Sequence, residues 1–103
     1  MIHDDRFYKL ELLILALLKH KDYTSSEITH LIQKLSQQTI SIKEGIVFTK
    51  LYYYTDADLL STYVKDNQTY YHINEAGLIR YDMLKRSYND LIIAIDNILS
   101  INH

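Results

Sequence analysis

The chain has 103 residues, 48% of them hydrophobic, which suits a single small globular domain with a modest core. It has no cysteine, which excludes disulfides, thiolate metal sites and a cysteine nucleophile. Its formal net charge is −2, so it lacks the basic excess of a typical nucleic-acid-binding protein.

The first predicted helix runs from about Asp5 to His20. Its apolar side chains recur at helical spacing and comprise Phe7, Leu10, Leu13, Ile14, Leu17 and Leu18. Acidic residues precede this apolar run and no small-residue cleavage site follows it, which indicates a core helix rather than a signal peptide. Because no run reaches the length of a membrane span, we expect a cytoplasmic protein without a membrane partner.

The second predicted helix begins near Thr24. Thr24 with Glu27 three residues later is a capping-box pattern, in which each side chain bonds the other residue's backbone N–H. An apolar stripe follows, made of Ile28, Leu31, Ile32 and Leu35. Ile40 and Ile42 then alternate with polar neighbours, which predicts a short strand or an extended entry into the next element.

The stretch "KEGIVFTKLYYYTDADLL", residues 43–60, contains three consecutive tyrosines, which favour a strand on propensity alone. A strand would place a lysine among its apolar residues. A helix would group Val47, Leu51 and Tyr54 on one face, with Phe48 beside it. The helix is therefore predicted, with Tyr54 in the core and with Tyr52 and Tyr53 exposed or in contact with a partner.

Residues 60–73 are predicted to form a β-hairpin, because polar and apolar residues alternate on both sides of the turn residues "DNQ". Asn74 occupies the N-cap position of a long final helix that extends from Glu75 to about Ser100.

An apolar seam runs along this final helix with alternating spacings of three and four. Its members are Tyr81, Leu84, Tyr88, Leu91, Ile95 and Ile98. Such a seam is typical of a helix packed lengthwise against another helix. The helix could close over the core of its own chain. We favour a homodimer interface, because the seam is too long for the remaining residues to cover.

These elements predict a mainly α fold with a small β-hairpin. Residues 1–74 form a winged helix-turn-helix domain and residues 75–103 a C-terminal dimerisation helix. In this order the sequence resembles the PadR-like transcriptional regulators. "GIVFTKLYYYTDADLL" aligns without a gap with the family pattern "GTLYPALRRLEEEGLI", and "TYYHINEAG" is similar to the wing ending "KYYRLTEAG". The matching positions are Gly45, Phe48, Leu51, Tyr70, Tyr71, Glu75, Ala76 and Gly77.

The resemblance implies a homodimeric regulator that binds double-stranded DNA, in the role of a repressor, with no enzymatic activity and no cofactor. By this resemblance the third helix enters the major groove and the wing touches the DNA backbone. The corresponding residues are Lys43, Thr49, Lys50, Tyr52 and Tyr53 on the helix, with Lys65 on the wing. The sequence departs from the family pattern where a basic pair is replaced by Tyr52 and Tyr53, a proline by Thr49 and the helix-ending glycine by Asp58. The two tyrosines could instead cover the junction between helix and wing.

Some PadR-like proteins bind flat hydrophobic compounds between their subunits, beside an aromatic residue at about the position of Tyr88. By analogy, a small aromatic or hydrophobic effector would lie near Phe7, Tyr8, Tyr88 and Ile92, although aromatic residues at helical spacing more often belong to the core. The five histidines are scattered, with no pair at metal-ligand spacing and no catalytic set. A rival hypothesis is a winged-helix dimer that binds a protein partner through its tyrosine-rich face and binds DNA weakly or not at all.

Overall fold

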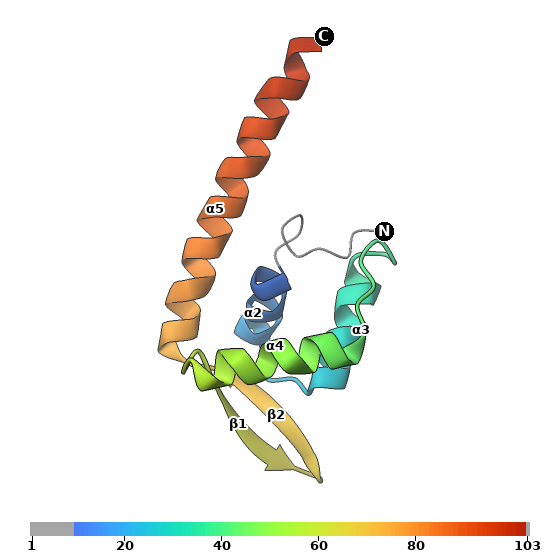
Figure 1. The fold of residues 1–103 in the computed structure, drawn as a ribbon, viewed down its shortest axis with the longest axis vertical. Coiled ribbons are helices and arrows are strands. Elements are labelled where there is room, and N and C mark those ends of the chain that lie inside the picture. Colours follow the sequence, from blue (N-terminus) through green and yellow to red (C-terminus); the bar gives the residue numbers. More distant parts are fainter. Residues whose placement is uncertain (1–9, 103) are drawn as a thin grey trace.

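The computed structural model describes residues 10–102. In chain order the elements are α2 (Leu10–His20), α3 (Ser25–Leu35), α4 (Glu44–Asp56), β1 (Leu60–Lys65), β2 (Gln68–Ile73), α5 (Glu75–Leu99) and the short 3₁₀ helix η1 (Ser100–Asn102). Helices α2, α3 and α4 form a cluster, the β-hairpin projects from one side of it, and α5 extends away on the other side (Figure 1). This arrangement confirms the predicted winged helix-turn-helix with a long C-terminal helix.

Helix α2 lies at the centre of the core, in contact with α3, α5 and β2. Ile14 and Leu15 are fully buried, and Leu12 is only 7% exposed. The prediction of a single apolar stripe on this helix was incomplete, because α2 is covered on several sides and therefore buries residues outside the stripe. The part of the predicted helix that precedes Leu10 lies outside the described residues.

Helix α3 begins with the predicted capping box. The N–H of Glu27 donates to Thr24 Oγ1 at 3.1 Å, and the N–H of Thr24 donates to Glu27 Oε1 at 2.9 Å. Ile28 and Ile32 are buried, but Leu35 is 65% exposed. The prediction that Leu35 belongs to the buried stripe was wrong, because the last turn of α3 extends past the core.

Of the two predicted alternatives around Ile40 and Ile42, the short strand does not form, and residues 40–43 lead into α4 without regular secondary structure. The Oγ of Ser36 accepts the N–H of Ile40 at 3.0 Å, and both isoleucines pack partly buried against the core. The place of a third strand is taken by Tyr23, which forms an isolated bridge to Tyr71 with a backbone hydrogen bond of 2.9 Å.

Residues 44–56 form a helix rather than a strand, despite the three consecutive tyrosines, because their apolar residues recur at the helical period. Val47 and Leu51 are fully buried, and Tyr54 packs half-buried against the core, as predicted. Phe48 is 55% exposed, so it lies farther out than the prediction placed it. The helix ends in a Schellman motif, in which Asp58 adopts a left-handed φ of 62° and occupies the position where glycine is usual.

The β-hairpin pairs Leu60 with Ile73 at its base and Lys65 with Gln68 at its tip. Asp66 and Asn67 form the two-residue turn with φ values of 52° and 63°. Two consecutive positive φ angles are typical of a type I′ turn, whose twist matches that of the strands. The predicted wing is thus confirmed, and its tip is exposed.

Helix α5 begins at Glu75, after Asn74 at the N-cap position. The Asn74 side chain does not cap the helix; its Nδ2 donates instead to the carbonyl oxygen of Asp58 at 3.2 Å. Gly77 is buried where α5 leaves the hairpin, and a Cβ at this position would lie 2.4 Å from the carbonyl oxygen of Leu59. The first turn of α5 therefore packs directly on the backbone that joins α4 to β1.

Candidate nucleic-acid interface

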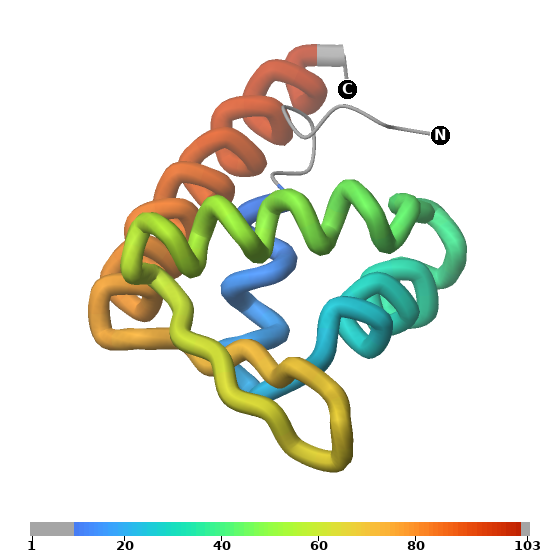
Figure 2. The backbone as a smooth tube through the Cα atoms, turned by 60° about the horizontal axis from the view of Figure 1, so that its bottom comes forward, coloured from blue at the N-terminus to red at the C-terminus, as the bar shows by residue number. Residues whose placement is uncertain are grey.

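The outer face of α4 is the first part of the candidate interface. It is turned away from α2 and lies above the hairpin (Figure 2). Tyr52 and Tyr53 are 62% and 60% exposed, as predicted, and their rings meet edge to face with centroids 5.8 Å apart. Thr49 is exposed, and its hydroxyl donates to the carbonyl of Gly45 at 2.9 Å, which leaves its oxygen lone pairs and methyl group free to face a partner.

The lysines predicted to contact DNA are distributed over three places. Lys43 is the exposed N-cap residue of α4, and Lys65 is exposed at the tip of the wing. Lys50 is half-buried on the side of α4 and already has an interaction partner. The structure thus places the predicted residues along α4 and at the tip of the wing without gathering the lysines into a cluster.

The charge of this region is slightly negative. Residues 43–73 contain three lysines and four acidic residues, a formal charge of −1. Most protein–DNA complexes obtain much of their affinity from lysine and arginine contacts with phosphates. A DNA complex of this face would therefore depend unusually strongly on uncharged contacts.

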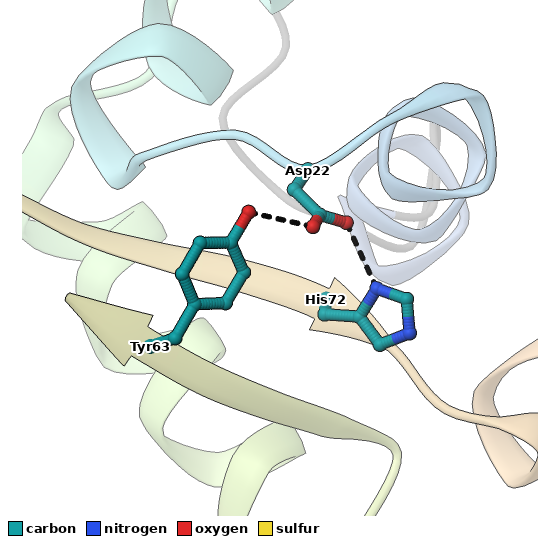
Figure 3. A network of polar contacts seen from close by, with 3 residues as sticks. All are labelled: Asp22, Tyr63 and His72. Carbon is teal, nitrogen blue, oxygen red and sulfur yellow. Dashed lines mark hydrogen bonds and ion pairs between the residues drawn. The ribbon is translucent and has the colours of Figure 1, made fainter. Parts of the chain in front are cut away.

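A polar network that the sequence did not reveal holds the hairpin to the segment between α2 and α3 (Figure 3). Asp22 accepts a hydrogen bond from the Tyr63 hydroxyl at 2.7 Å and lies 2.9 Å from His72 Nδ1. Burial raises the pKa of Asp22, but the hydrogen bonds from Tyr63 and His72 outweigh this effect and hold it below its usual value. The hydrogen bond to Asp22 also raises the pKa of Tyr63.

The contact between Asp22 and His72 could not be inferred from spacing in the sequence. Asp22 and His72 are 50 residues apart, and only the pairing of Tyr23 with β2 brings them together. Tyr63 also stacks on Tyr70 across the hairpin, with ring centroids 5.5 Å apart. Both strands of the wing therefore contact Asp22, which holds the wing to the segment between α2 and α3, while the tip of the wing stays exposed.

Helix α5 is joined to α2 by an ion pair between Arg80 and Glu11. Arg80 Nε and Nη2 donate to the two carboxylate oxygens at 2.7 and 3.1 Å. These hydrogen bonds raise the pKa of Arg80 above its usual value. Lys19 and Lys85 lie over the ring of Tyr81 at 4.9 and 5.9 Å from its centroid. The first three turns of α5 are thereby attached firmly to the winged domain.

The predicted seam on α5 divides into two parts. Tyr81 and Leu84 are half-buried and pack against the core of their own chain. The four residues farther along are exposed: Tyr88, Leu91, Ile95 and Ile98. Within residues 10–102 the intramolecular alternative therefore accounts for the first part of the seam and leaves the second without a covering surface.

Only part of the expected effector pocket lies among the described residues. Phe7 and Tyr8 lie outside the described residues, and Tyr88 and Ile92 are 38% and 37% exposed on α5.

Residues 10–102 contain no group of three or more histidine or acidic residues that could hold a metal ion. In the same part of the chain no helix is long and apolar enough to cross a membrane.

No protein-family model and no curated protein matches the chain in sequence. Several solved structures are similar to it in fold. A transcriptional regulator from Clostridium thermocellum is 20% identical with a TM-score of 0.85, and the match covers 94% of this chain and 96% of that one. A PadR-like transcriptional regulator from Bacillus cereus is 21% identical with a TM-score of 0.82, over 92% and 95% of the two chains.

Bacillus subtilis PadR, solved in complex with operator DNA, is 20% identical with a TM-score of 0.64; the match covers 74% of this chain and 46% of that one. The fold is thus that of PadR-type transcription regulators, which confirms the resemblance seen in the sequence. These three neighbours are transcription regulators.

Proposed function

We propose that this chain is a homodimeric, PadR-like transcriptional repressor that binds double-stranded DNA in a sequence-specific manner. The observation that carries the proposal is the exposed outer face of α4 beside an ordered wing, on a fold shared with a regulator solved on operator DNA. Helix α4 would enter the major groove, where Thr49, Tyr52 and Tyr53 contact phosphates and thymine methyl groups. Lys43, Lys50 and Lys65 would supply the charged contacts to the backbone.

The proposed dimer rests on the second half of α5. Leu91, Ile95 and Ile98 are 46%, 41% and 66% exposed, and they continue the seam that Tyr81 and Leu84 begin. A second copy of the same helix would cover this row and place the two winged domains on neighbouring half-sites of DNA.

An effector would fit the same interface. Tyr88 and Ile92 are exposed in the single chain, so a second α5 would enclose them between the two subunits. An apolar space of this kind suits a flat hydrophobic compound held by ring stacking. In the proposed mechanism, the compound relieves repression by favouring an arrangement of the two winged domains that no longer matches the half-sites.

A second candidate function is supported by the charge and aromatic content of the same face. Ile46, Phe48, Tyr52 and Tyr53 are all at least half exposed, and the formal charge around them is −1. Exposed tyrosine with little lysine is typical of protein interfaces. In this alternative the dimer binds a protein partner through α4.

The deciding experiment is a fluorescence-anisotropy titration of the protein against DNA from upstream of its own gene, with a scrambled duplex as control, at two salt concentrations. The regulator predicts tighter binding to the native sequence than to the scrambled one. It also predicts a shallow salt dependence, because each phosphate neutralised by a lysine contributes a slope of only about 0.9 and the interface holds few lysines. Equal binding to both duplexes by a verified dimer would favour the protein-interaction module.

A further inference from the structure

A groove of about 340 Å³ lies between the start of α3, the middle of α4 and strand β2. Figure 2 shows β2 and the beginning of α3 side by side beneath α4. Its lining is rich in hydroxyl and amide groups and includes no lysine or arginine; the lining residues are Thr24, Ser25, Ser26, Phe48, Gln68, Thr69 and Tyr71. Phe48 of α4 and Gln68 and Thr69 of the wing border the groove, so it adjoins the candidate interface.

Tyr71 lines this groove and carries an unpartnered hydroxyl. The side chain is only 6% exposed and belongs to the core, and among the described residues its hydroxyl makes no hydrogen bond. Residues 10–102 contain no fully buried side-chain oxygen or nitrogen without a partner, so the small exposed part of Tyr71 includes its hydroxyl. Burial raises the pKa of Tyr71, which keeps the group protonated and able to donate.

The beginning of α3 supplies further donors. The N–H of Glu27 is taken by Thr24 Oγ1, but the N–H groups of Ser25 and Ser26 precede the first residue that can bond within the helix. They carry the positive end of the helix dipole towards the groove. Hydroxyl, amide and helix-terminal donors that converge on one groove form a typical contact for a phosphate oxygen.

Two carboxylates oppose a free anion at this site. Glu27 accepts the N–H of Thr24, and Glu44 accepts the hydroxyl of Ser25 at 3.2 Å. Their charge lowers the affinity of the groove for a phosphate ion in solution. A phosphate on a duplex that other contacts already hold has less entropy to lose on binding and can still enter.

We propose that this groove holds a phosphate of the DNA backbone through uncharged donors, with the Tyr71 hydroxyl as the central one. The inference rests on the proposed regulator function and deepens it, since it assigns to neutral groups a contact that lysine or arginine makes in most protein–DNA complexes. Salt dependence of binding comes from counterions displaced by lysine and arginine. A neutral contact therefore changes the affinity and leaves the salt slope unchanged.

The test compares two variants that each lose a single hydroxyl. Tyr71→Phe removes the proposed donor, whereas Tyr70→Phe removes the hydroxyl of the adjacent residue, whose ring stacks on Tyr63 at the opposite face of the hairpin. Losing a hydrogen bond to a charged group typically costs about a factor of ten in affinity. We expect Tyr71→Phe to bind the native duplex about tenfold more weakly with an unchanged salt slope, and Tyr70→Phe to bind like the original protein.

A Lys65→Ala variant measured alongside should reduce the salt slope by about one phosphate equivalent, which calibrates the readout. Thermal melting and the near-ultraviolet circular dichroism spectrum verify that each variant is folded. If the original protein binds the native duplex and Tyr71→Phe binds it equally well, the phosphate assignment is refuted while the regulator function stands.

If the original protein binds no duplex, the regulator function fails, and the phosphate assignment that rests on it fails with it. The two failures are distinguishable, because only the first abolishes binding of the original protein to the native duplex.

Discussion

Replacement of Gly77 by alanine tests the close contact that fixes α5 to the winged domain. A Cβ at this position would lie 2.4 Å from the carbonyl oxygen of Leu59 and 2.7 Å from Cγ1 of Ile73. An ordinary carbon–oxygen contact needs roughly 3.3 Å, so the added carbon is almost 1 Å too close to a backbone atom. Neither neighbour is the free end of a flexible side chain, and the start of α5 must therefore move.

Two opposing effects determine the magnitude. Overpacking of this kind typically costs about 1–3 kcal/mol. Alanine is favoured over glycine within a helix by up to about 1 kcal/mol, and less in the first turn, where Gly77 lies. We therefore expect Gly77→Ala to lower the free energy of unfolding by about 1–2 kcal/mol.

Gly45→Ala is the matched control. It lies in the first turn of α4, and nothing lies within 4 Å of the position where its Cβ would be. The same change should stabilise the protein there by about 0.5–1 kcal/mol. Urea denaturation of both variants at one fixed protein concentration measures the two effects with the contribution of dimer dissociation held equal. Equal shifts of the same sign in both variants would contradict the steric argument.

Three further substitutions test other contacts. Asp58→Gly should raise the free energy of unfolding by about 0.5–1 kcal/mol in urea denaturation, because glycine adopts the left-handed φ of 62° without strain. Tyr63→Phe should destabilise the protein near neutral pH by removing a hydrogen bond that lowers the pKa of Asp22. That contribution is fully present above the unfolded pKa of about 4 and disappears as the pH falls through the lower folded value, so the two proteins should converge in acid. Ile95→Asp should weaken the proposed dimer by about 3 kcal/mol or more, counted over both copies, whereas Asn97→Asp should leave it intact in sedimentation equilibrium; a monomeric original protein would remove the basis of this prediction.

Elements that depend on local pattern could be predicted from the sequence. The burial of Val47 and Leu51 at helical spacing outweighed the strand propensity of the neighbouring tyrosines, and α4 formed as predicted. Asp66 and Asn67 specified a tight turn because both tolerate positive φ angles. Thr24 and Glu27 formed their capping box within one helical turn. Each of these features is determined by residues close together in the chain.

Features that depend on tertiary packing could not be predicted in the same way. Periodicity gave no sign that Tyr23 bridges to β2, so it could not place Asp22 beside His72. It also missed the burial of Leu12, since an amphipathic pattern describes one covered face and α2 is covered on several. Phe48 lies outside the core because α3 and β2 leave a groove beside it, which is a property of three elements together.

The attachment of α5 limits how a proposed dimer could respond to an effector. Gly77 packs on the backbone of Leu59, and both carboxylate oxygens of Glu11 bind Arg80, so the first turns of α5 belong mechanically to the winged domain. Beyond Tyr88 the helix has no such contacts within the described chain, and its apolar residues are exposed. A change in the distance between two DNA-binding surfaces would therefore have to arise where the two α5 helices meet. An effector enclosed beside Tyr88 would act at that junction, and a substitution there should alter the response to the compound without altering the fold of the single subunit.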